Sequence, residues 1–118
     1  MMEGSADIPG HVTLAQAVTA LAESSGGTSY APMIDRGTLQ VGLYAPRGGD
    51  PQKPHDQDEV YVVMSGRGDF RNGSQSHAFQ PGDVLFVPAG VEHAFENFSD
   101  DLYVWVVFYG PPGGEATG

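Results

Sequence analysis

Two short stretches of the sequence carry side chains that bind transition metals. In the first, His55, Gln57 and Glu59 alternate directly after a proline. Because successive side chains of an extended chain point to opposite sides, this alternation places all three on one face. In the second, His93 follows a Pro-Ala-Gly corner at 88–90. Imidazole, amide oxygen and carboxylate are ligands that a divalent metal accepts without cysteine, so the two stretches together predict a metal site.

Strand-like runs adjoin both stretches and must position these side chains. The run Val60–Val63 is β-branched and aromatic and leads to a glycine turn at Gly66. The run Val84–Val87 enters the corner, and a further strand is expected from about Val91. On that strand His93 shares a face with an aromatic ring, that of Phe95. The ligands are therefore expected on neighbouring strands of one sheet structure.

The two stretches resemble the two sequence motifs of the cupin superfamily of small β-barrels. The second motif, G-x5-P-x-G-x2-H-x3-N, is matched at every fixed position, by Gly82, Pro88, Gly90, His93 and Asn97. The first motif, G-x5-H-x-H-x3,4-E-x6-G, is matched in part, by His55, Glu59 and Gly66. Its first histidine is replaced by Lys53, and its leading glycine is shifted. The resemblance covers roughly residues 38–109.

The resemblance implies an all-β fold, the double-stranded β-helix or jelly-roll-like cupin barrel. It also implies a divalent transition metal, Fe, Mn, Ni or Zn, held by His55, Glu59 and His93. No single reaction follows, because this superfamily includes dioxygenases, isomerases, decarboxylases, sugar-binding domains, storage proteins and regulators.

Lys53 is the departure that matters most, because an ammonium group cannot ligate a cation. Three arrangements are open. Lys53 can point to solvent on its long stem, Gln57 can supply a fourth oxygen ligand, or the site has lost its metal and Lys53 pairs with Glu59 or an anionic ligand. We also predict that Arg47 and Tyr61 line the pocket together with Lys53, where Arg47 could hold a carboxylate or phosphate.

Two acidic residues lie between the candidate ligands. Asp56 and Asp58 alternate with His55, Gln57 and Glu59, so we expect them on the opposite face, solvated or supporting the ligands from behind.

These residues support two classes of function. The first is a metal-dependent enzyme of the dioxygenase or isomerase type that acts on a small polar molecule. The alternative is a non-catalytic small-molecule binding or sensing module that uses the same pocket with or without metal. A purely structural role is the weakest hypothesis, because a packed barrel has no need of converging His, Gln and Glu side chains.

Composition limits the partners. The formal net charge is -10, with five Lys and Arg residues in 118, so nucleic acid and an anionic membrane surface are not expected partners. There are no cysteines, which excludes disulfides and thiolate metal sites. The chain begins without a basic and apolar leader and contains no apolar run of membrane-spanning length, and we expect a cytoplasmic protein.

The rest of the chain predicts a single domain over 1–118, with a barrel core at about 28–110 and flexible termini at 1–12 and 111–118. A capping-box pattern at Thr13 predicts one short N-terminal helix. Asn72-Gly73 predicts a hairpin. The run Leu102–Tyr109 is apolar on both faces, which predicts burial of its outer side by the helix or by a second subunit, and hence a homodimer.

Overall fold

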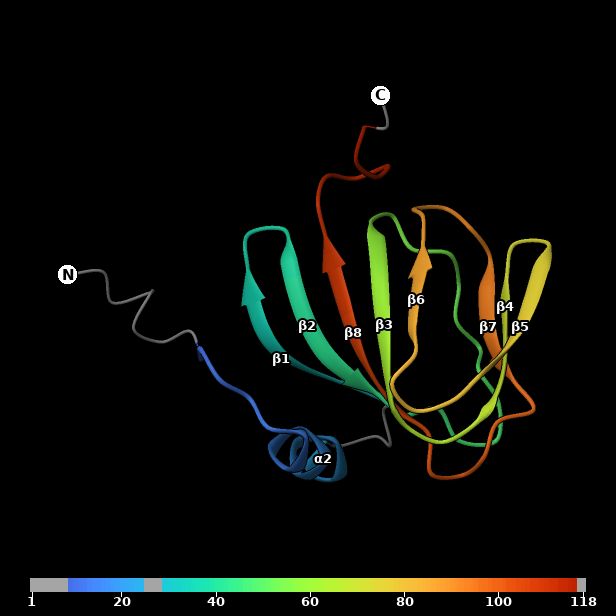
Figure 1. The fold of residues 1–118 in the computed structure, drawn as a ribbon. Helices are drawn as coiled ribbons and strands as arrows, with labels where there is room; N and C mark the ends of the chain where they lie inside the picture. The colour runs from blue at the N-terminus through green and yellow to red at the C-terminus, as the bar shows by residue number, and fades with distance from the viewer. Residues whose placement is uncertain (1–8, 25–28, 117–118) are drawn as a thin grey trace.

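Two antiparallel β-sheets with one helix beside them make up the computed structural model, which describes residues 9–24 and 29–116 (Figure 1). The larger sheet has the strand order β1-β2-β8-β3-β6 and the smaller has β5-β4-β7. In chain order the elements are α2 (Leu14–Glu23), β1 (Tyr30–Arg36), β2 (Leu39–Tyr44), β3 (Asp58–Ser65), β4 (Gly68–Asn72), β5 (Gln75–Phe79), β6 (Val84–Val87), β7 (His93–Glu96) and β8 (Tyr103–Tyr109). The predicted all-β fold with one short helix is confirmed.

Local sequence signals account for several element boundaries. Thr13 caps α2 with the predicted reciprocal bonds: its hydroxyl accepts from the Gln16 backbone N–H, and the Gln16 side chain accepts from the Thr13 N–H. Asn72-Gly73 turns β4 into β5, and Gly73 has a φ of 61°, a conformation that glycine adopts without strain. The helix and the hairpin therefore form where the sequence predicts them.

The core lies between the two sheets and is mainly aromatic. Phe70 and Phe95 from the smaller sheet pack against Tyr61 from β3, with ring centroids 4.8–5.6 Å apart. Tyr44 from β2 also packs against Phe95. Along β3 the inward side chains alternate with outward ones, as a strand packed on a core requires. The candidate ligand Glu59 is the first inward residue of that series.

The outer face of the larger sheet is apolar. We use "outer face" for Val60, Val62, Val84, Phe86, Trp105 and Val107, which pair across β6, β3 and β8. Val84 is 66% exposed and Phe86 48%. The helix α2 packs on β1 and β2 instead, so it does not provide the expected cover for β8.

The segment after β8 is hydrogen-bonded to the barrel, while the flexible terminus expected from 111 onward stays a prediction. The Gly113 N–H donates to the Asp56 carbonyl over 2.7 Å, and the Glu115 N–H donates to the Asp58 carboxylate over 2.9 Å. The sequence could not show this, because Glu115 and Asp58 lie 57 residues apart. Residues 1–8 and 117–118, also expected to be flexible, lie outside the described part of the chain.

In the described part of the chain, no helix has the length and apolar character needed to cross a membrane.

Candidate metal centre

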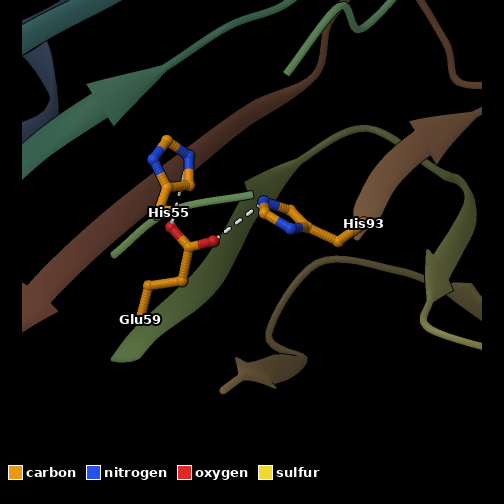
Figure 2. Close-up of side chains that lie close together, drawn as sticks. All are labelled: His55, Glu59 and His93. Atoms are coloured by element: carbon orange, nitrogen blue, oxygen red, sulfur yellow. Dashed lines mark ion pairs between the residues drawn. The ribbon is translucent and has the colours of Figure 1, made fainter. Parts of the chain in front are cut away.

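Three predicted ligands converge. His55 lies just before β3, Glu59 near the start of β3 and His93 at the start of β7, and each offers one ligand atom within 4.8 Å of the others (Figure 2). The His93 Nε2 lies 2.8 Å from Glu59 Oε1, and the His55 Nε2 lies 3.8 Å from Glu59 Oε2. Glu59 is fully buried, His93 is buried and His55 is partly exposed.

The corner after β6 brings the two motifs together. The Gly90 N–H donates to the His55 carbonyl over 2.8 Å, and the Ala89 N–H donates to the Asp58 carboxylate over 2.9 Å. Gly90 has a φ of 81°, a conformation that side chains with a Cβ rarely adopt. The corner therefore fixes the start of β7 against the segment that carries His55.

Asp58 thus has a structural role that corrects the expectation of a solvated or supporting carboxylate. It is buried and accepts bonds from two backbone N–H groups, those of Ala89 and Glu115. These hydrogen bonds hold the pKa of Asp58 below its ordinary value, because they favour the charged carboxylate.

Two polar atoms of the triad are buried without a hydrogen-bond partner: Glu59 Oε2 and His93 Nε2. The His93 Nδ1 lies 2.9 Å from the Val91 carbonyl, which can only accept, so Nδ1 carries the proton. In neutral His93 the lone pair of Nε2 then faces Glu59 Oε1 at 2.8 Å. Both atoms are acceptors, so no hydrogen bond joins them despite the short distance. Two acceptors facing each other in a buried site need a positive charge between them, either a proton or a metal cation.

The electrostatics of His93 agree with this interpretation. Burial opposes the charged form of His93, but the Glu59 carboxylate, the Val91 carbonyl and the charge of Asp50 outweigh burial and raise its pKa above the ordinary 6.5. The site therefore attracts positive charge.

The donor set and its spacing fit a transition metal. Two atoms bound at about 2.0–2.1 Å to one ion lie roughly 2.8–3.4 Å apart at bond angles between about 90° and 109°. One nitrogen–oxygen distance in the triad, 2.8 Å, lies within this range, and the other, 3.8 Å, is longer. Two imidazoles and one carboxylate with an open side are the donors that non-haem iron and catalytic zinc use.

Gln57 makes other contacts. Its amide nitrogen donates to the backbone carbonyls of Thr38 and Gly110, at 2.8 and 2.9 Å. None of the hydrogen bonds among the described residues joins it to the triad. Gln57 precedes β3, which begins at Asp58, and it lines a cleft together with His55. A role for Gln57 as fourth ligand stays a prediction.

Arg47 lies at the far end of β8 from the triad, which corrects its expected position. Its guanidinium donates to the carbonyl of Leu102 over 2.8 Å and stacks on the Tyr103 ring. Glu59 instead pairs with Phe108, near the other end of β8. Arg47 therefore does not line the metal pocket.

Tyr61 and Lys53 both lie close to the triad. Tyr61 is buried, and its hydroxyl is 2.9 Å from Gln52 Oε1 and 3.4 Å from Glu59 Oε1. Burial raises the pKa of Tyr61, so it remains a phenol that donates. Lys53 is exposed and lines a depression of about 320 Å³ together with His93. Contact of either residue with a substrate stays a prediction.

Gln52 and Asp50 are the site residues that sequence reasoning missed. Gln52 Oε1 lies 3.3 Å from His55 Nε2, and its amide nitrogen donates to Asp50 over 2.9 Å. The Asp50 carboxylate also accepts from the Tyr44 hydroxyl and from the Phe95 N–H. The only sequence signal was the Gly- and Pro-rich loop that carries both residues towards His55.

A cleft of about 440 Å³ opens beside His55. Such a volume suits a small molecule. Its walls are polar and aromatic and come from β1, β2 and β8 of the larger sheet and from the loop before β3: Tyr30, Gln40, Tyr44, Gln52, His55, Asp56, Gln57, Val106 and Phe108. A molecule in this cleft would contact the exposed side of the triad.

Comparisons with known proteins agree with this fold. Residues 40–109 match the family model described as the cupin domain. An uncharacterized Streptomyces coelicolor protein is 46% identical over 85 residues, which are 70% of this chain and 81% of that protein. The transcriptional activator RhaS of Mannheimia succiniciproducens is 36% identical over 56 residues, 48% of this chain and 21% of that protein.

Solved structures show the same fold. The protein TT1209 from Thermus thermophilus has a TM-score of 0.61 and 27% identity, and the match covers 80% of this chain and 95% of that one. A cupin-2 domain protein from Shewanella frigidimarina has a TM-score of 0.56 and 24% identity, and the match covers 70% of this chain and 80% of that one.

Proposed function

Since the chain belongs to the cupin domain family, we propose that it is a metal-binding enzyme of the dioxygenase or isomerase type that acts on a small polar molecule. One observation carries the proposal: His93 Nε2 and Glu59 Oε2 are buried without hydrogen-bond partners, beside a cleft large enough for a small molecule. Such atoms are costly in a fold that has no ligand for them.

The chain's own residues have separable tasks in this proposal. His55, Glu59 and His93 would hold the ion, and the Val91 carbonyl fixes the ring of His93 with Nε2 towards it. When bound, Fe, Mn, Ni or Zn would supply Lewis-acid chemistry or, for the redox-active ions, activation of dioxygen. The aromatic core around Tyr61 and Phe95 covers the buried side of the triad, and the cleft gives a substrate access to His55.

The cleft favours an uncharged polar substrate. Among the described residues that line it, none is Lys or Arg, while Tyr30 and Gln40 contribute a hydroxyl and an amide that are hydrogen-bonded to each other over 2.7 Å. Asp56 adds a carboxylate, which would repel an anion. The expectation that Arg47 binds a carboxylate or phosphate has no support from its position.

Elemental analysis of the purified, untagged protein tests the proposal. We expect close to one equivalent of a transition metal per chain after reconstitution, and its loss in His93→Ala. His77→Ala is the matched control, since His77 is exposed on β5 and its ring contacts Gln75 rather than the triad. A wild-type protein that holds no metal, or a His93→Ala variant that keeps it, would contradict the proposed site.

A non-catalytic binding or sensing module is the second candidate. The 56 residues shared with the activator RhaS favour it, because they place a related stretch in a regulatory protein. Metal-independent binding of small neutral molecules, measured by calorimetry on chelator-treated protein, would support this candidate over an enzyme.

A further inference from the structure

We propose that the side-chain oxygen of Gln52 is a fourth ligand of the metal held by His55, Glu59 and His93. The inference rests on the proposed metal site and extends it to a residue outside the sequence motif. It names a different side chain from Gln57, whose amide nitrogen donates to the Thr38 and Gly110 carbonyls.

Position supports this role. Gln52 Oε1 lies 3.3 Å from His55 Nε2, within the roughly 2.8–3.4 Å expected for two atoms bound to one ion. The same oxygen lies 2.9 Å from the Tyr61 hydroxyl, which is itself 3.4 Å from Glu59 Oε1. Gln52 Oε1 therefore contacts one member of the triad, His55, directly and is linked to a second, Glu59, through the Tyr61 hydroxyl.

The orientation of the Gln52 amide is fixed by its other end. Its nitrogen donates to Asp50 Oδ2, and a carboxylate can only accept, so the oxygen must face the triad. Asp50 is held in turn by the Tyr44 hydroxyl and the Phe95 N–H. An amide oxygen held by such a network is prepared to bind a cation at little cost in side-chain entropy.

The backbone around Gln52 supports the same geometry. Pro51 precedes Gln52 and Pro54 follows Lys53, and each proline fixes its own φ and restricts the residue before it, which is Asp50 or Lys53. Lys53, at the position of the missing motif histidine, is exposed. The loop thus presents Gln52 to the triad and Lys53 to solvent.

Two substitutions at position 52 test the proposal with metal-binding readouts. Gln52→Ala should lower the affinity for Zn²⁺, measured by competition with a chelator, by at least about tenfold. Gln52→His should bind Cu²⁺ through three imidazoles instead of two, counted by pulsed EPR. The controls are Gln57→Ala, which should retain the wild-type affinity, and Lys53→His, which should still show two imidazoles. Circular dichroism of each metal-free variant checks that the fold is intact.

The outcomes separate the two proposals. If the wild type binds metal while Gln52→Ala keeps its affinity and Gln52→His still shows two imidazoles, Gln52 is not a ligand and this inference is wrong. If Gln52→His fails to fold, the affinity of Gln52→Ala decides alone. If the wild type binds no metal at all, the proposed function fails and this inference fails with it.

Discussion

Replacing Glu59 by glutamine should stabilise the metal-free protein while weakening metal binding. Glu59 is fully buried, and its Oε2 has no hydrogen-bond partner. An unsatisfied buried polar group costs about 1–3 kcal/mol, and a glutamine amide can donate to the His93 Nε2 that now faces an acceptor. At about 4 °C per kcal/mol for a domain of this size, Tm should rise by roughly 4–12 °C.

The gain should depend on pH. In the wild type, protonated His93 pairs with Glu59, and its folded-state pKa is raised. This contribution to stability is fully present below the unfolded pKa of His93 and is lost as pH rises through the folded value. The advantage of Glu59→Gln should therefore be largest near about pH 8.5 and shrink towards about pH 6.

Thermal unfolding followed by circular dichroism, with chelator present, measures this effect. Glu92→Gln is the control, since Glu92 is exposed next to His93 and its change should stay within about 0.5 kcal/mol. Added Zn²⁺ should raise the Tm of the wild type. It should raise the Tm of Glu59→Gln much less, because that variant has lost the carboxylate ligand. A metal-free Glu59→Gln protein that is less stable than the wild type at about pH 8.5 would refute the reasoning, because Glu59 would then stabilise the fold without metal.

Two further predictions concern the fold and its assembly. Asp58→Asn should lower Tm at neutral pH, because the lowered pKa of Asp58 contributes stability that is present above its unfolded pKa and lost as pH falls through the folded one. Thermal unfolding at neutral and at strongly acidic pH measures this effect, and Asp56→Asn, at an exposed position, is the control. An equal difference in Tm between Asp58→Asn and the wild type at both pH values would contradict the prediction. We also propose that the apolar outer face forms a homodimer, so light scattering should give twice the chain mass of 12.5 kDa. Phe86→Asp should give the mass of the monomer. The control Ala78→Asp, at an exposed position on β5, should keep the mass of the dimer. A monomeric wild type would refute the proposed dimer.

The sequence alone predicted the candidate ligands within each motif. His55 and Glu59 are four residues apart, and His93 follows a corner set by Pro88 and Gly90, so short-range turn and strand rules indicate each motif, while the Gly90 N–H bond to the His55 carbonyl brings the two together. The capped helix and the Asn72-Gly73 hairpin were predictable for the same reason, because their hydrogen bonds join near neighbours in the chain.

Only the tertiary structure decided which other side chains surround the triad. Gln57 was expected to share its face, and it lies one residue before β3 with its amide nitrogen donating to the Thr38 and Gly110 carbonyls. Gln52 reaches the triad because Asp50 is anchored by the Phe95 N–H, 45 residues away. Arg47 was placed by the path of β2 along β8, which carries it away from the site. These contacts depend on how distant strands pair, and a residue's neighbours in the sequence carry no information about that pairing.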